Sequence, residues 1–215
     1  MYSGADEVVT ETAAFLREGL AAGEPAMVMV APEKIALLRA ELGEHADAVT
    51  FVDMTEAGRN PAWIIPAWRE FARANAGAPM RGVGEPIWAA RSAGELVECQ
   101  RHESLLNYAF ADADGFRLLC PYDVEALDAD VVAEARRSHP YISEGGVEHD
   151  SSEYTGHIAS PTAATDPLPE PQTVVHGLPF NEEMMDAVRR AVERHAARVG
   201  LAAPRSDDLV LAVNE

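Results

Sequence analysis

The sequence predicts an α/β fold in which a mainly parallel central sheet is flanked by helices, followed by a helical C-terminal tail. Short continuous apolar runs, typical of strands buried on both faces, alternate with longer segments of helical periodicity. This alternation favours parallel strands joined by helical crossovers. The composition, 47% hydrophobic and 25% charged residues, is ordinary for a globular protein with an apolar core.

The first half of the chain alternates three predicted helices with two strands. They are a helix over residues 8–22, a strand over 26–31, a helix over 32–46, a strand over 49–54 and a helix over 63–76. Gly23 ends the first helix, and Pro32 both stops the first strand and starts the second helix. Asn60 is the expected N-cap of the third helix, with Pro61 at its first position. Pro66 falls inside this helix and predicts a kink or a later start.

The second half continues the alternation and then changes character. The predicted elements are a strand over residues 80–83, a helix over 92–111, a strand over 116–120, a helix over 129–139, a helix over 182–200 and the start of another over 206–215. Ser92 and Glu95 form an expected capping box. Between the two predicted domains lies a stretch rich in Ser, Gly, Pro and acidic residues, which is typical of a linker. The predicted domains are residues 1–141 and 177–215, with the linker over 142–176.

The charge balance and the cysteine count exclude several classes of protein. The chain has 36 acidic and 17 basic residues, a formal net charge of -19. Because such a surface repels nucleic acid and anionic lipid, we expect neither as a partner. No apolar run reaches the ~18–20 residues of a membrane span and no signal peptide opens the chain, which predicts a cytoplasmic protein. Cys99 and Cys120 are expected as thiols rather than as a disulfide framework.

The expected binding site lies at the carboxyl edge of the sheet, where ligands bind in doubly wound folds. The predicted strand ends carry Asp53, Glu85 and Asp123. Acidic residues also cap helices at such positions. Glu85 is the stronger candidate for binding, because it lies between a glycine and a proline and is followed by apolar residues.

One predicted helix carries polar groups on its apolar face. The spacing of three to four residues puts Cys99 and Glu103 on the same face, with His102 at its margin. A carboxylate on an apolar face is costly unless it is paired. We therefore expect it to find a partner, such as Arg59, Arg91 or His102, or a ligand.

Eight residues are the predicted ligand contacts, and none is predicted to be catalytic. They are Arg59, Glu85, Trp88, Arg91, His102, Glu103, Cys120 and Tyr122. The two glutamates would anchor the ligand through hydrogen bonds or, if paired with each other, share a proton. The arginines would balance their charge or bind an anionic ligand, and the two aromatic residues would form an apolar wall.

A metal, haem or thiol redox sensor is the first alternative. Cys99, His102 and Cys120 could supply three ligands, since Cys-x-x-His spans one helical turn. Structural zinc sites usually show two such paired spacings, and this chain has one. We therefore expect no metal at these residues.

The common nucleotide-binding and hydrolase motifs are missing from the sequence. It contains no G-x-x-x-x-G-K-[ST], G-x-G-x-x-G, G-x-S-x-G or H-E-x-x-H pattern. A nucleotide-handling or hydrolytic first domain therefore has no motif to support it, and we expect this domain to use no cofactor.

Residues 2–140 resemble the MEDS family, the methanogen/methylotroph sensory domain. The matching segments are FLREGLAAGEP (15–25), DMTEAGRNPAWIIPAWREF (53–71), RGVGEPIW (81–88), ELVECQRHESLLNYAF (95–110), LLCPYD (118–123) and EARRSHP (134–140). The resemblance implies a three-layer α/β sandwich that is RecA-like but lacks the phosphate loop. It also implies a sensor of small hydrocarbon-derived molecules rather than an enzyme, and it identifies no ligand.

The residues from Phe180 to Glu215 are similar to the start of anti-sigma-factor serine kinases of the GHKL ATPase superfamily. The similarity rests on AVRRAVERHAARVGL (187–201) and DDLVLAVNE (207–215). It implies that Glu215 matches the catalytic base of that family. The magnesium-binding asparagine, the glycine boxes and the ATP lid would lie beyond it. ATP and magnesium are thus expected cofactors of an intact C-terminal domain only, and this chain is not expected to be an enzyme.

The leading expectation is a small-molecule-sensing regulatory domain that controls an attached anti-sigma-type kinase. Its expected partners are the ligand and the anti-sigma and anti-anti-sigma proteins of the pathway, and a homodimer stays open. Two further alternatives are a residual nucleotide-binding domain of RecA-like ancestry and a dimerisation scaffold without a ligand.

Overall fold

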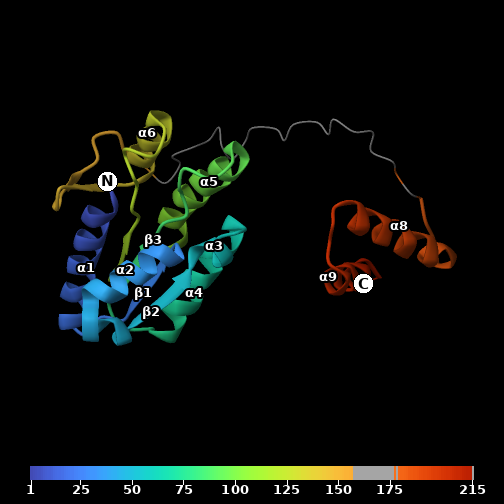
Figure 1. Ribbon diagram of the computed structural model, residues 1–215, viewed down its shortest axis with the longest axis horizontal. Coiled ribbons are helices and arrows are strands. Elements are labelled where there is room, and N and C mark those ends of the chain that lie inside the picture. The colour runs from blue at the N-terminus through green and yellow to red at the C-terminus, as the bar shows by residue number, and fades with distance from the viewer. Residues whose placement is uncertain (157–176, 178, 215) are drawn as a thin grey trace. The chain divides into compact units, whose positions relative to one another are not determined.

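The computed structural model describes residues 1–156, 177 and 179–214 (Figure 1). The chain divides into two compact units, with the boundary between Asp166 and Pro167. Within the described residues, no helix is both long and apolar enough to cross a membrane.

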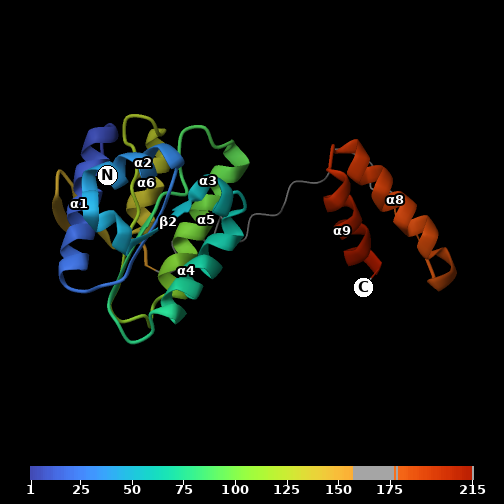
Figure 2. The same cartoon turned by 60° about the horizontal axis from the view of Figure 1, so that its bottom comes forward.

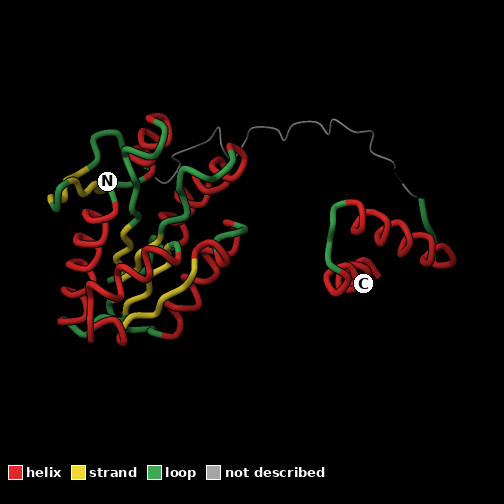
Figure 3. Tube along the Cα trace, viewed as in Figure 1, coloured by secondary structure: helices red, strands yellow, loops and turns green. Residues whose placement is uncertain are grey.

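The first unit alternates helices and strands, as Figure 3 shows in red and yellow. Its elements are α1 (Ala5–Ala21), β1 (Ala26–Val30), α2 (Pro32–Leu42), β2 (Val49–Asp53), α3 (Met54–Ala57), α4 (Ile64–Ala74), β3 (Met80–Gly84), α5 (Ala93–Ala109), β4 (Phe116–Leu119), α6 (Ala129–Ser138), β5 (Tyr141–Glu144) and β6 (Val147–Asp150). Short 3-10 helices at Gly43–Ala48 and Pro61–Trp63 precede β2 and α4.

The central sheet has four parallel strands in the order β2-β1-β3-β4. In the middle of the sheet, Val28 of β1 lies opposite Phe51 of β2 on one side and Val83 of β3 on the other. The strands β1 and β3 are buried along their whole length. Strand β1 accordingly reads as a continuous apolar run, whereas β3 includes the buried Arg81, which pairs with Glu18 and Glu24. The prediction of an α/β fold with a parallel sheet is confirmed.

Helices cover both faces of the sheet. Side chains along β1 point alternately to the two faces, and their contacts show which helices cover each face. Val28 and Val30 pack with α1 and α2 in one core cluster. Met27 and Met29 point to the opposite face and pack with α4 and α5. Figure 2 shows the two pairs of helices on opposite sides of the sheet.

The indole of Trp68 in α4 lies directly over the backbone of β3. A Cβ added at Gly82 would come within 2.8 Å of the Trp68 ring and 2.7 Å of Leu118. Glycine at this position therefore lets the fully buried Trp68 sit against the sheet.

The chain order reverses between β1 and β3, because β2 lies on one side of β1 and β3 on the other. Such a switch point opens a crevice at the carboxyl ends of the two strands. Here it lies between the end of β1, the start of α2 and Glu85, which follows β3.

A β-hairpin occupies the start of the segment that the sequence predicts as a linker. Strands β5 and β6 pair in antiparallel fashion, and Ile142 of β5 is buried. Gly145 and Gly146 form the turn with φ of 56° and 74°. A two-residue hairpin loop of type I′ requires positive φ at both of its residues. The Gly-Gly pair was the local signal for this hairpin.

Pro66 does not kink its helix. Because α4 begins at Ile64, Pro66 lies in the first turn, where its missing N–H has no helical partner to lose. Of the two expectations for Pro66, a kink or a later helix start, the structure shows the later start, at Ile64.

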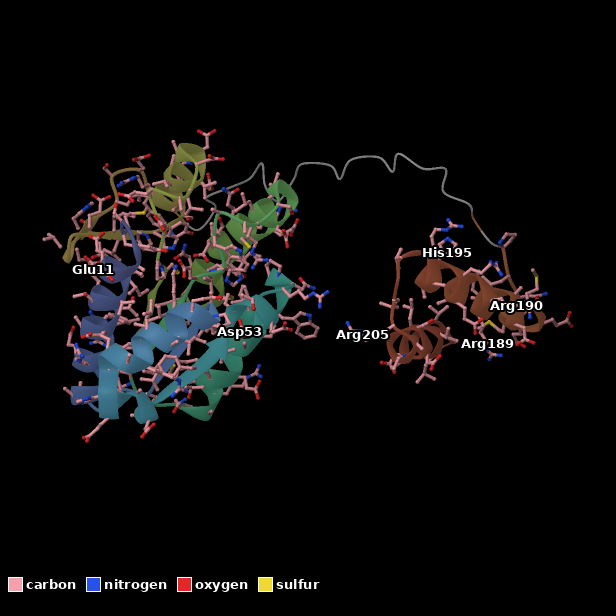
Figure 4. The ribbon with its side chains drawn as sticks, in the orientation of Figure 1. Glu11, Asp53, Arg189, Arg190, His195 and Arg205 are labelled. Atoms are coloured by element: carbon pink, nitrogen blue, oxygen red, sulfur yellow. The ribbon has the colours of Figure 1, made fainter. Side chains whose placement is uncertain are left out.

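The second unit is a pair of helices, α8 (Met185–Arg198) and α9 (Ala203–Asn214), preceded by a 3-10 turn at Glu182–Met184. Val188 and Ala196 of α8 are buried. Figure 4 labels basic residues along α8 and at the start of α9: Arg189, Arg190, His195 and Arg205. The second helix begins three residues earlier than the predicted Ser206, and Glu215 lies outside the described residues.

Candidate functional site at the carboxyl edge of the sheet

Three side chains from separate elements fill the switch point. The Tyr2 hydroxyl donates to Glu85 Oε1 at 2.7 Å, and Lys34 Nζ, from the first turn of α2, lies 2.5 Å from the same oxygen. The ammonium also donates to the Tyr2 hydroxyl at 2.6 Å. Glu85 therefore has both a counter-charge and a neutral donor.

Burial raises the pKa of Glu85, although Lys34 and Tyr2 act in the opposite direction. The cavity beside these side chains measures ≈ 10 Å³. A single water needs roughly 10–15 Å³, so this crevice has no room for a nucleotide. The carboxylate would also repel phosphate. The switch point is thus filled by a structural network.

A second polar cluster joins α5, the end of β4 and the end of α6. Its members are Glu103 in α5, Cys120 directly after β4 and His139 directly after α6. One ligating atom from each lies within 4.8 Å of the others. His139 Nε2 is 3.1 Å from Glu103 Oε2, and His102 Nε2 is 3.9 Å from Glu103 Oε1.

Glu103, the carboxylate of this cluster, is deeply buried, with 2% of its side chain exposed. Burial alone would raise its pKa, but His139, then His102 and the Cys120 thiol, lower that pKa overall. For His139 the two effects have the opposite sign: burial alone would lower its pKa, but the Glu103 carboxylate raises that pKa overall. Each side chain of the pair therefore favours the charged form of the other.

The Glu103–His139 pair is close but poorly aligned. Neither carboxylate oxygen of Glu103 has a partner with hydrogen-bond geometry, and the same is true of His102 Nδ1. Buried polar atoms in native proteins are nearly always hydrogen-bonded, so these three atoms require an explanation. His139, with 20% of its side chain exposed, and Cys120, which is partly exposed, are the least buried members of the cluster.

Local structure explains why these side chains meet. The capping box at Ser92 and Glu95 starts α5, and Cys99, His102, Glu103 and Leu106 are its buried residues. At the end of α6, Asn107 donates from α5 to the Ser138 carbonyl at 2.6 Å. This bond ties the two helices together next to His139.

The family comparison covers most of this unit. The methanogen/methylotroph, DcmR sensory domain (MEDS) matches residues 1–140, which include both polar clusters. The chain belongs to the MEDS family. Comparison with curated proteins and with solved structures gave no match. MEDS is a sensory domain, so the chain carries a sensor, and its family is not a catalytic one. The match ends at residue 140, and the similarity of the C-terminal unit to GHKL kinases stays a prediction.

In the MEDS domain, Arg91 holds a loop together. Its Nε donates to the Pro86 carbonyl and its Nη2 to the Gly58 carbonyl, each at 2.9 Å. The guanidinium also lies 3.8 Å over the Trp88 ring. It thus faces backbone carbonyls, an indole and, at 3.7 Å, the Glu95 carboxylate, rather than Glu85 or Glu103. Arg59 is exposed.

Cys99 belongs to the core of the MEDS domain. It is fully buried, and its Sγ donates to the Pro86 carbonyl at 3.3 Å. Burial raises the pKa of Cys99 to about 11. The structure therefore groups Cys120 with Glu103 and His139, and not with Cys99.

Of the eight predicted contacts, the structure brings four together. Glu103 and Cys120 meet His139, and His102 Nε2 lies 3.9 Å from Glu103 Oε1. The Tyr122 ring packs edge-on against the His139 ring with centroids 5.6 Å apart. Sequence reasoning missed His139, although it lies in the EARRSHP segment of the MEDS resemblance. It also missed Tyr2 and Lys34, which are remote from Glu85 along the chain.

A groove of ≈ 520 Å³ in the MEDS domain opens between the N-terminal residues, α6 and the β5–β6 hairpin. Its polar walls are already paired: Arg136 bonds to Glu144 at 2.5 Å, and the Ser3 N–H donates to Glu7 at 2.5 Å. Since no buried group there lacks a partner, the groove is a weaker candidate than the Glu103 cluster.

Proposed function

We propose that this protein is a small-molecule-sensing regulatory domain whose effector binds at the cluster of Glu103, His139, Cys120 and Tyr122. The single observation that carries the proposal is the Glu103 carboxylate, which is buried and makes no well-aligned hydrogen bond at either oxygen, although His139 Nε2 lies 3.1 Å from Oε2. An unpartnered buried polar group costs about 1–3 kcal/mol, more for a charge. An effector that donates a hydrogen bond to Glu103 would recover that cost.

The expected effector is small and uncharged or weakly basic. Glu103 accepts hydrogen bonds, while Tyr122 and the adjacent core offer an apolar wall. Very small ligands gain at most about 1.5 kcal/mol per non-hydrogen atom, so a molecule of three such atoms binds no tighter than a Kd of about 0.5 mM. Simple hydrocarbon derivatives with a hydroxyl, amine or thiol group fit this description.

The proposed response passes to the C-terminal unit, which we propose to be the start of an anti-sigma-type kinase. The support is the similarity of residues 187–201 and 207–215 to that family. Anti-sigma and anti-anti-sigma proteins would then be the partners, and ATP and magnesium would belong to the intact kinase domain. An effector can switch such a module only if it binds two states of the sensor with different affinity.

A residual nucleotide-binding function is less well supported. The ≈ 10 Å³ cavity at the switch point and the Glu85 carboxylate both disfavour a phosphate ligand. Thermal unfolding with and without millimolar ATP tests this alternative, and we expect no shift.

The effector proposal is tested by thermal unfolding with a panel of short alcohols, amines and thiols at millimolar concentration. We expect at least one compound to raise the unfolding temperature of the wild type and of Glu98→Gln, an exposed position on the same helix. The isosteric Glu103→Gln variant should lose the shift. A shift that survives unchanged in Glu103→Gln, or no shift from any compound, contradicts the proposal.

A further inference from the structure

Three chemically different ligating groups meet in the Glu103 cluster. A carboxylate oxygen, a thiol sulfur and an imidazole nitrogen from three separate elements lie within 4.8 Å of one another. Zinc bonds to nitrogen and oxygen are about 2.0–2.1 Å long, which puts two tetrahedral ligand atoms about 3.3 Å apart. The 3.1 Å between His139 Nε2 and Glu103 Oε2 is close to that separation.

The orientation of His139 is held by its other nitrogen. Nδ1 lies 2.8 Å from the Ala135 carbonyl oxygen. Because a carbonyl can only accept, Nδ1 carries the proton, and Nε2 is the nitrogen that faces the cluster. Histidine ligands of metals usually have this arrangement, in which the outer N–H donates to a carbonyl and fixes the ring.

The unpartnered oxygens of Glu103 are the second, independent observation. They are buried and lie next to Cys120 and His139, yet neither oxygen makes a hydrogen bond of good geometry. A divalent cation would bond to this carboxylate directly. With the carboxylate and a thiolate as its two anionic ligands, a divalent ion would also leave the buried site neutral, which limits the desolvation cost.

We infer that Glu103, Cys120 and His139 bind a zinc ion and leave its fourth coordination position open. The mixed sulfur, nitrogen and oxygen donors suit zinc better than magnesium or calcium, which prefer oxygen alone. Three protein ligands with one open position is the arrangement of zinc sites that take up an exogenous ligand. This set replaces Cys99 and His102 of the sequence-based alternative with Glu103 and His139.

The open position gives the sensor a means of binding a very small effector. A hydroxyl, thiol or amine that coordinates the metal would gain a bond in addition to its small apolar contact area. The partly exposed Cys120 and His139 mark the side from which it would enter. This part of the inference rests on the proposed function, whereas zinc binding itself does not.

The first experiment measures metal binding to the intact chain without any effector. Protein stripped with a chelator and dialysed is titrated with zinc against a chromophoric chelator, and then with cobalt. We expect one zinc per chain. Cobalt should give the visible bands of a tetrahedral site and a near-ultraviolet thiolate charge-transfer band, which adventitious binding to surface carboxylates cannot give.

Matched variants locate the site. Substitution of residues that only support the ligands of a metal weakens metal binding about 10- to 100-fold. Cys120→Ser and His139→Gln each remove a proposed ligand, so each should weaken zinc binding by at least about 100-fold. Cys99→Ser and His149→Gln are the controls, since Cys99 bonds to a carbonyl and His149 is exposed on β6. Both controls should bind zinc with the wild-type affinity. Cys99→Ser should also keep the thiolate charge-transfer band of bound cobalt.

Two results would overturn the zinc site, and neither requires a variant to fold. The first is a folded wild type, judged by circular dichroism, that takes up no zinc. The second is cobalt bound without a charge-transfer band. Zinc binding without any effector response contradicts the proposed function alone. An effector response in a protein that binds no zinc contradicts the metal site alone.

Discussion

Glu103 Oε2 and His139 Nε2 lie 3.1 Å apart, although one residue belongs to the middle of α5 and the other follows α6. The contact joins the two helices at the carboxyl edge of the sheet, next to Cys120 and Tyr122. It is the only place among the described carboxylates where both oxygens are buried and lack a hydrogen-bond partner.

His139→Gln should destabilise the metal-free protein because it leaves the Glu103 carboxylate buried without a cation. Breaking such a pair costs several kcal/mol, and we expect about 2–4 kcal/mol here because His139 keeps 20% exposure. Urea unfolding in the presence of a chelator measures the change. The double variant Glu103→Gln/His139→Gln should be less destabilised than the sum of the singles, with a coupling of about 1–3 kcal/mol.

The control for this cycle is His149→Gln, whose side chain is half exposed. It should change stability by no more than about 0.5 kcal/mol. Additive free energies for the Glu103 and His139 variants would show that the two side chains do not interact.

The Glu85 carboxyl should make stability pH-dependent. Burial raises its pKa above 4.5, so the folded state holds this proton more tightly than the unfolded state. Stability from this group is therefore complete below pH 4.5 and is lost as the pH rises through the folded pKa. Relative to Glu85→Gln, the wild type should lose stability across that window. Urea unfolding of both proteins over the pH series checks this, and parallel curves would contradict it.

Gly82→Ala should destabilise the first unit by about 1–3 kcal/mol through overpacking. Its Cβ would lie 2.8 Å from the ring of the fully buried Trp68 and 2.7 Å from the half-buried Leu118, closer than real Cβ contacts allow without a shift. Gly94→Ala is the matched control, because nothing lies within 4 Å of its Cβ and the position is helical. The control should be neutral or stabilise by up to about 1 kcal/mol. Equal effects in the two variants would contradict the close packing.

Arg91→Met should cost about 2–4 kcal/mol, since it leaves the Pro86 and Gly58 carbonyls without their charged donor. Arg91→Lys should restore little of this, because an ammonium cannot reproduce the planar fork or its stacking on Trp88. Unfolding curves followed by tryptophan fluorescence test both points. Full rescue by lysine would show that charge alone matters.

The sequence predicted most of the fold because its local signals were strong. Apolar runs located β1 and β2, a capping box located the start of α5, and Pro32 located the start of α2. The β5–β6 hairpin was missed because its outer positions are polar and its surroundings resemble a linker.

The site was predicted only in part, for a physical reason. Periodicity shows that Glu103 faces inward, but it cannot show which distant side chain it meets. That partner, His139, depends on how α6 packs beside α5, and the Asn107 bond to Ser138 that guides this packing has no sequence pattern. The sequence likewise located Glu85 at the carboxyl edge of the sheet, but its partners Tyr2 and Lys34 could be identified only from the tertiary structure.

Hydrogen–deuterium exchange with the most stabilising panel compound tests the central claim most directly, namely that the Glu103 cluster is the sensing site. We predict slower exchange in three segments of the wild type, the second half of α5, residues 119–123 and residues 136–140, and no change in Glu103→Gln. Protection confined to the groove formed by residues 1–7 and 144–153, or protection that persists in Glu103→Gln, would contradict the account.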